Sequence, residues 1–304
     1  MMIRPVALVA TLIVSAALCF APQLLGTYHL SVLFQLLAFI ALTQSWATFS
    51  GMTGYASLGY AAFYGLGAYV MALGWMVLPL WQLIPLAGLA AGLLALAIGM
   101  VALRVRGPYF VILTLGISEL VRYVVVAVEA KLGASGRVLF LVPDMPTLYF
   151  FMLALAAAAT AITWYIGRSR MGAGLQAIRE DETAAITVGV PTARIKTIAF
   201  ALSAIIPGMV GAVWILRSTY FEPAQVFSPA MSFSIITMAV IGGSDKALGP
   251  IFGAAFVVLL SELLWARAPQ LYMIVLGVLL ICFVLFAPDG IYGRLRAALV
   301  RDPK

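Results

Sequence analysis

Long apolar runs separated by short polar segments make up most of this 304-residue chain. A helix needs about 20 mostly apolar residues to cross a bilayer, and ten runs approach that length. The runs are continuous rather than alternating, so they predict helices and not the strands of a membrane β-barrel. The third run is rich in glycine, and the eighth is short. The predicted spans cover residues 6–25, 30–50, 55–75, 80–103, 108–128, 148–166, 197–216, 229–243, 248–266 and 271–288.

The composition indicates that lipid is the solvent for most of the surface. Hydrophobic residues form 64% of the chain and charged residues 10%, whereas a soluble domain is about half apolar and a quarter charged. We therefore expect an all-α polytopic membrane bundle, with residues 1–304 as a single transmembrane domain. The first run resembles a signal peptide in having Arg4 before it, but its length and the lack of a small-residue cleavage site favour an uncleaved helix.

The basic residues predict the orientation of the bundle. With the N terminus inside, thirteen of the 18 basic residues fall in inner loops and tails, four fall in outer loops, and Arg122 lies within a span. Cytoplasmic loops carry an excess of Lys and Arg, and an even number of spans returns the chain to its starting side. We expect both termini in the cytoplasm. The net charge of +7 reflects this bias and does not indicate a nucleic-acid partner.

The least apolar stretch, residues 167–196, falls on the cytoplasmic side in this topology. Gly172 and Gly174 are expected to end the preceding helix, after which a short amphipathic helix forms from Leu175. Its apolar face would contain Leu175, Ile178, Ala185 and Ile186. In an alternative arrangement, a second short helix begins near Glu182, with Asp181 as its cap.

Gly189 and Pro191 are expected to end this helical region. Residues 172–190, here called the coupling segment, would then lie across the membrane face and fit a groove on a cytosolic partner. The alternative is a solvated loop whose charges only fix the topology.

The interior offers candidates for a substrate path. Glycine lets helices approach closely and permits broken helices where protein or water covers the backbone. A charge at the bilayer centre costs about 3 kcal/mol, and two opposite charges one helical turn apart can offset each other. Plain helix packing and a structural ion pair are the alternatives. The candidate residues are Gly54, Ser57, Gly59, Tyr60, Phe63, Glu119, Arg122, Gly242 and Gly243.

Other chemistry is poorly represented in the sequence. One histidine and no clustered carboxylates within the spans argue against an enzyme or a metal site. The chain contains no G-x-x-x-x-G-K-[ST] phosphate loop. We expect no bound cofactor.

Five segments, in this order, resemble the M-type permease subunits of ABC importers for branched-chain amino acids, and the resemblance spans nearly the whole chain. Tyr60 stands where a histidine is common in that family, and Tyr55-Ala56 where Gly-Gln is common, which leaves the exact substrate open. The segments are FSGMTGYASLGYAAFYGLGAYV (49–70), RVRGPYFVILTLGISELVR (104–122), GLQAIREDETAAITVGV (174–190), VIGGSDKALGPIFGAAF (240–256) and LFAPDGIYG (285–293).

The resemblance implies a multi-pass protein of the bacterial inner membrane that pairs with a second homologous permease. Separate ABC ATPase subunits would bind ATP and Mg, and an extracytoplasmic solute-binding protein would deliver the substrate. Urea, short amides or a sugar are alternative cargoes, and an ion-driven secondary carrier is an alternative class. The implied coupling residues are Arg179, Glu180, Asp181, Glu182, Ala184, Ala185 and Gly189.

Overall fold

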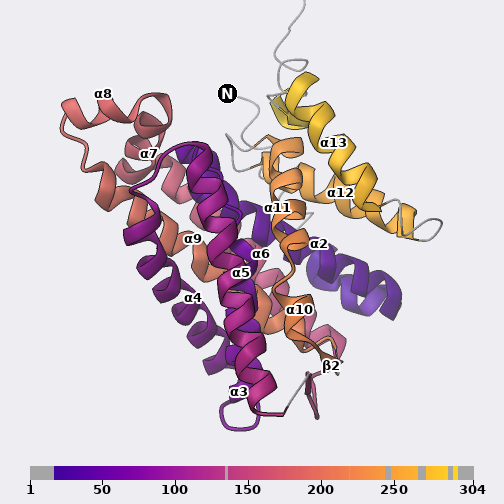
Figure 1. Ribbon diagram of the computed structural model, residues 1–304. Helices are drawn as coiled ribbons and strands as arrows, with labels where there is room; N and C mark the ends of the chain where they lie inside the picture. Colours follow the sequence, from indigo (N-terminus) through magenta and orange to yellow (C-terminus); the bar gives the residue numbers. More distant parts are fainter. Residues whose placement is uncertain are drawn as a thin grey trace, which may run out of the picture.

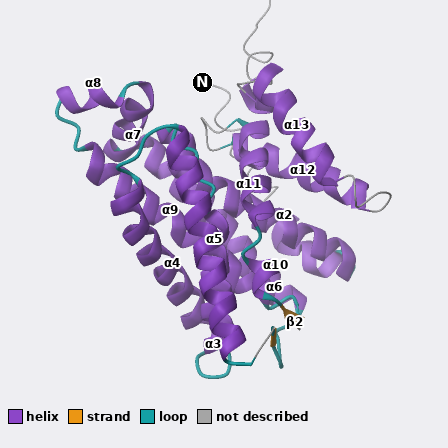
Figure 2. Ribbon diagram, viewed as in Figure 1, coloured by secondary structure: helices purple, strands orange, loops and turns teal. Residues whose placement is uncertain are grey.

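The computed structural model describes residues 17–133, 136–218, 220–243, 248–265, 272–286 and 290–293. These residues form a helical bundle with a short antiparallel strand pair at one end (Figures 1 and 2). The elements are α2 (Thr27–Trp46), η1 (Ala47–Gly51), α3 (Tyr60–Gly74), α4 (Leu80–Ala102), α5 (Pro108–Lys131), β1 (Arg137–Val138), α6 (Met145–Arg168), α7 (Arg170–Glu180), α8 (Glu182–Thr187), α9 (Thr192–Ile215), β2 (Tyr220–Phe221), α10 (Pro223–Val226), α11 (Pro229–Gly242), α12 (Gly249–Trp265) and α13 (Tyr272–Phe286).

Six described helical stretches are long and apolar enough to cross a membrane, and α3, α12 and α13 are shorter apolar helices. The predicted all-helical, multi-pass architecture is confirmed. The number of ten spans and the side on which the termini lie remain predictions. Most of the first predicted span, 6–25, lies outside the described residues, and its residues 17–24 are helical.

The central helix is α9, which packs against α4, α3 and α2. Its contact with α3 depends on two glycines: a Cβ atom added at Gly67 would overlap the backbone of Gly208. Such a close approach of two backbones is typical of helix pairs in membranes. The hydrophobic effect does not drive association within lipid, so helices associate through close packing at small residues.

A predicted helix beginning at residue 55 is wrong, because residues 54–59, here called the broken segment, are not helical and α3 begins only at Tyr60. Gly54 has a φ of +75°, which interrupts helical geometry. Nearby side chains satisfy the freed backbone groups. Ser50 Oγ accepts from the Ser57 amide at 3.3 Å, and Trp46 Nε1 donates to the Ser57 carbonyl at 3.0 Å. Residues 57–59 of this segment are buried, so protein covers the irregular backbone there, as it must at membrane depth.

The two ends of the bundle carry different structures. Helices α7 and α8 lie at one end, and α10 with β2 lies at the opposite end (Figure 1). The ladder pairs Arg137 with Phe221 and Val138 with Tyr220, which joins the loop after α5 to the segment after α9.

Candidate functional site

The coupling segment begins where α6 ends, and the structure corrects the position of that break. The helix stops at Arg168, and Ser169 caps α7 by accepting a hydrogen bond from the Gly172 amide at 3.2 Å. Gly172 and Gly174 thus lie inside α7 rather than between helices. Gly172 is needed because an added Cβ atom would overlap the Ile166 carbonyl across this sharp turn.

Asp181 divides the coupling segment into two helices, which confirms the arrangement with a second helix starting at Glu182. Its carboxylate accepts from the amides of Thr183 at 2.7 Å and Ala184 at 3.0 Å. These backbone hydrogen bonds, that of Ala184 first, lower the pKa of Asp181. Gly189 then ends the region with a φ of +87°, as predicted.

The apolar face of the coupling segment is only partly as predicted. Leu175, Ile178 and Ala185 are buried, but Ile186 is 48% exposed. The prediction assumes one continuous helix, in which Ile186 would share a face with Leu175 and Ile178. The chain instead changes direction at Asp181, because α7 and α8 are separate helices. Ile186 of α8 and Val188, which follows the helix and is 78% exposed, therefore place apolar side chains on the solvent-facing side of this region, here called the outer surface of α8.

Glu182, at the start of α8, is the centre of an ionic cluster. Its Oε1 atom lies 2.6 Å from Lys196 Nζ, and its Oε2 atom accepts from the Tyr55 hydroxyl and lies 3.5 Å from Arg106 Nε. Lys196 is buried and donates also to the Leu103 carbonyl at 3.4 Å. This Glu182 cluster (Tyr55, Arg106, Glu182, Lys196) joins α8 to α9, to the broken segment before α3 and to the turn before α5.

Glu182 is among the coupling residues predicted from the sequence, but its three partners are not. Lys196 could have indicated the cluster, because it lies at the start of an apolar run. A lysine that becomes buried there needs an acidic partner. Other predicted coupling residues lie around the cluster: Arg179 donates to the Gly51 carbonyl at 3.0 Å, while Glu180 and Ala184 are exposed.

Electrostatics favour the ionised form of Glu182. Burial opposes ionisation of Glu182, but hydrogen bonds from Lys196 and Tyr55 and the charges of Lys196 and Arg106 outweigh it. The pKa of Glu182 therefore lies below its ordinary value of 4.5. The Tyr55 hydroxyl is the donor in its hydrogen bond to Glu182.

The lowered pKa predicts how the stability of the protein depends on pH. A carboxyl whose folded pKa is depressed contributes stability above its unfolded pKa, and that contribution is lost as pH falls through the folded value. We expect the difference in melting temperature between the wild type and Glu182→Gln to be constant above about pH 5.5 and to shrink below about pH 4.5. Thermal unfolding of both proteins across this range tests it; a difference that shrinks near neutral pH would contradict the assignment.

Five predicted path residues lie together at the broken segment and the first turn of α3. Gly54 is exposed, whereas Ser57, Gly59, Tyr60 and Phe63 are buried. The Tyr60 hydroxyl donates to Ser203 Oγ at 3.0 Å, and the Phe63 ring packs 5.5 Å from that of Phe200. These residues join α3 to α9 in the interior.

Glu119 and Arg122 form the predicted pair on α5, with Arg122 Nη2 2.6 Å from Glu119 Oε2 and about a quarter of each side chain exposed. Glu119 lies five residues beyond Thr114, whose hydroxyl accepts from the Leu58 amide of the broken segment, so the pair is more than one helical turn from that contact. The other Glu119 oxygen, Oε1, is buried and has no hydrogen-bond partner.

Gly242 and Gly243 serve a different contact. A Cβ atom at Gly242 would overlap the backbone of Gly249 and Gly253, and one at Gly290 would overlap Gly243. These glycines allow α11, α12 and the helical residues 290–293 to pack with their backbones almost touching.

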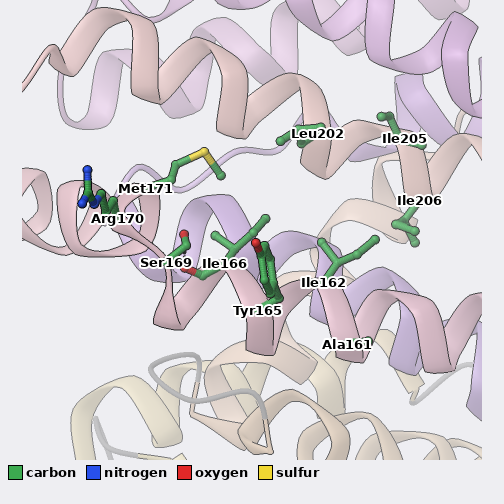
Figure 3. A pocket seen from close by; sticks show the side chains of 10 residues that line it. All are labelled: Ala161, Ile162, Tyr165, Ile166, Ser169, Arg170, Met171, Leu202, Ile205 and Ile206. Carbon is green, nitrogen blue, oxygen red and sulfur yellow. Dashed lines mark hydrogen bonds between the residues drawn. The ribbon is translucent and has the colours of Figure 1, made fainter.

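Two hollows flank the coupling segment. A groove of about 690 Å³ runs between α6 and α9 (Figure 3). Tyr165 and Ile162 of α6 face Leu202 and Ile205 of α9 across it, with Arg170 at one end (Figure 3). Its lining is largely apolar and contains no carboxylate, so it is poorly suited to hold an ammonium group.

The second hollow is a cleft of about 540 Å³ between the coupling segment and the broken segment. Residues 53–56, 107–108, 111 and 178–182 line it. The coupling segment and the broken segment therefore share one cleft, beside the Glu182 cluster. The described residues contain no group of three or more His, Cys, Asp or Glu that could hold a metal.

Comparison with known proteins gives a consistent family. Residues 26–284 match the family described as "Branched-chain amino acid transport system / permease component". The high-affinity branched-chain amino acid transport system permease proteins LivM of Salmonella typhimurium and Escherichia coli are each 28% identical over 290 residues. Each comparison covers 82% of this chain and 66% of the relative. No solved structure matches significantly.

The matched relatives are transport permeases and not enzymes, in agreement with the sequence expectation. The family match covers most of the chain and includes the broken segment, α5 and the coupling segment. This multi-pass membrane protein therefore belongs to the family of permease components of branched-chain amino acid transport systems.

Proposed function

We propose that the chain is a permease subunit of an ATP-driven importer for branched-chain or other apolar amino acids in the bacterial inner membrane. It works with a second homologous permease, two ABC ATPase subunits that bind ATP and Mg, and an extracytoplasmic solute-binding protein. Family membership supports the transport role, and the contacts of the coupling segment support the link to an ATPase.

The observation that carries the proposal is the attachment of α8 to the bundle. Glu182 contacts Lys196 of α9, Tyr55 of the broken segment and Arg106 of the turn before α5. A force applied to α8 would reach α9 and the broken segment through hydrogen bonds, and the turn before α5 through an ion pair. A solvated loop that only fixes topology needs no buried lysine to hold it.

The outer surface of α8 provides a surface for the ATPase. Ile186 and Val188 expose apolar side chains next to Ala184 and Glu180. Exposed apolar side chains rimmed by polar ones are typical of protein interfaces. We assign this surface to the ATPase and the buried side of the coupling segment to transmission.

Helix α5 supports a position for the second permease. Only 11% of the most apolar stretch of α5 is buried within the chain. The exposed surface of α5 nevertheless carries the Glu119–Arg122 ion pair. Charges facing lipid are costly, so we place the path or the partner permease along α5. An ion-driven carrier is disfavoured because Arg122 already neutralises Glu119 at 2.6 Å.

Reconstitution tests this function. The chain is copurified from membranes, its ATPase and permease partners are identified, and the complex is placed in liposomes with its binding protein. Leucine uptake should stop on ATP depletion and persist when the membrane potential is collapsed. Uptake that instead follows the potential would overturn the proposal, and uptake of urea but not leucine would change the cargo.

A further inference from the structure

A second polar cluster lies at the end of the bundle opposite α8. Here the last turn of α5, the later part of α3, the short helix α10 and the β1–β2 ladder converge, and Figure 1 places α10 and β2 far from the coupling segment. If α8 meets the ATPase, this is the end at which external substrate arrives.

Glu129, at the end of α5, is the charged residue at the centre of this cluster. It is 3% exposed, and its Oε1 atom accepts from Arg137 Nε at 2.9 Å and from Nη2 at 2.7 Å. Its Oε2 atom is buried and has no hydrogen-bond partner. A buried carboxylate oxygen without a donor is costly, so this atom is suited to accept from a group that the chain does not supply.

Tyr69 of α3 has a second unpaired polar atom. The residue is 5% exposed, and its hydroxyl is buried without a partner. Its ring packs against Phe221 at 5.7 Å and Phe227 at 5.8 Å, and Phe221 is the ladder partner of Arg137.

These contacts place an anionic acceptor, a hydroxyl, a guanidinium and aromatic rings in one location. An ammonium group has three donors and needs acceptors, which Glu129 Oε2 and the Tyr69 oxygen provide. Arg137 has five N–H donors; its side chain is 28% exposed and can bind a carboxylate. Phe221 and Phe227 are 4% and 0% exposed and form an apolar wall behind the Tyr69 ring.

We propose that this Tyr69 cluster (Tyr69, Glu129, Arg137, Phe221, Phe227) is an entry site for an α-amino acid zwitterion with an apolar side chain. The ammonium binds Glu129 and Tyr69 and the carboxylate binds Arg137, while Phe221 and Phe227 hold the Tyr69 ring in position. The assignment rests on the proposed transport function and adds residues at which the permease itself recognises its cargo. A bridging water is the competing occupant of the two unpaired atoms.

Direct binding to the purified complex, without its binding protein, tests the site. Saturation-transfer NMR can detect weak binding of leucine, 4-methylpentanoate, which lacks the ammonium, and 3-methylbutylamine, which lacks the carboxylate. Charged hydrogen bonds contribute enough for a loss of about tenfold in affinity each. We expect both analogues to bind at least about tenfold more weakly than leucine.

Two variants and a matched control complete the test. Glu129→Gln should weaken leucine binding about tenfold, and Tyr69→Phe several-fold. Tyr69→Phe removes only an unpaired hydroxyl, so it should fold even if Glu129→Gln does not. Glu222→Gln removes a carboxylate beside β2 that accepts from Tyr220 at 3.1 Å, and should leave leucine binding within about twofold.

The outcomes separate this site from the wider proposal. A wild-type complex that imports leucine while Tyr69→Phe and Glu129→Gln bind it normally would overturn the site, indicate a water there, and leave the transport function intact. Analogues that bind as tightly as leucine would also overturn it. A wild-type complex that neither binds nor imports leucine would overturn both.

Discussion

Replacing Glu182 with lysine is expected to abolish uptake by the assembled transporter while the chain still inserts into the membrane. The change removes the partner of the buried Lys196 and places a third cation between Lys196 and Arg106. Breaking a buried ion pair from one side costs about 3–5 kcal/mol. Since α8 lies outside the predicted spans, this cost should displace the coupling segment rather than prevent insertion.

The measurement combines three readings on the same membranes: the amount of inserted chain, the ATPase activity of the complex, and leucine uptake. We expect normal insertion and a fall in uptake of at least about 100-fold, the factor that 3 kcal/mol represents. The double variant Glu182→Lys with Lys196→Glu restores an opposite pair and should recover part of the uptake. Normal uptake in the single variant would show that the Glu182 cluster has no part in coupling.

The membrane helices could be predicted from the sequence because their signal is local. The run 80–103 corresponds to α4 (Leu80–Ala102), and the run 248–266 corresponds to α12 (Gly249–Trp265). A helix is stable in lipid when its apolar residues are continuous over the membrane thickness, and a polar or glycine-rich segment ends the apolar run. The bounds of such a helix can therefore be predicted without knowing which helices pack against it. The Asp181 cap could also be predicted from the sequence, because its carboxylate accepts hydrogen bonds from residues only two and three positions ahead.

The Glu182 cluster could not be predicted in this way. Tyr55 is 127 positions from Glu182 along the chain and Lys196 is 14, and only the packing of α8 onto α9 and the broken segment brings them together. The Tyr69 cluster presents the same difficulty, since it draws residues from α3, α5, β1, β2 and the residue after α10. The sequence separation between ionic partners on different helices follows no fixed rule, so such pairs cannot be recognised from residue spacing alone.

Helix α3 links the two clusters. Tyr55 lies in the broken segment directly before α3, and Tyr69 lies within it, so a displacement of α8 reaches the helix that carries the proposed entry site. The 15 residues of α3 extend about 22 Å at the α-helical rise. The close contact of Gly67 with Gly208 of α9 holds this helix against the central one, so movement of α3 requires movement of α9.

Replacing Gly189 with proline is the second change expected to uncouple the transporter. Gly189 has a φ of +87° and donates its amide to the Ile186 carbonyl at 3.0 Å. Proline fixes φ near −65° and has no amide hydrogen, so it cannot form this turn. The connection from α8 to α9 must then change course, which moves Glu182 relative to Lys196 while leaving the spans intact.

Gly189→Asn is the matched control, because asparagine tolerates positive φ better than other residues with a side chain and an added Cβ atom at this position meets nothing within 4 Å. We expect the proline variant to insert normally and to lose at least about 90% of uptake, as a cost of about 1.4 kcal/mol already gives tenfold, and the asparagine variant to remain within about twofold of wild type. Wild-type uptake by the proline variant would show that the turn does not position α8. Equal loss in both variants would instead place residue 189 in direct contact with the ATPase, where any side chain interferes.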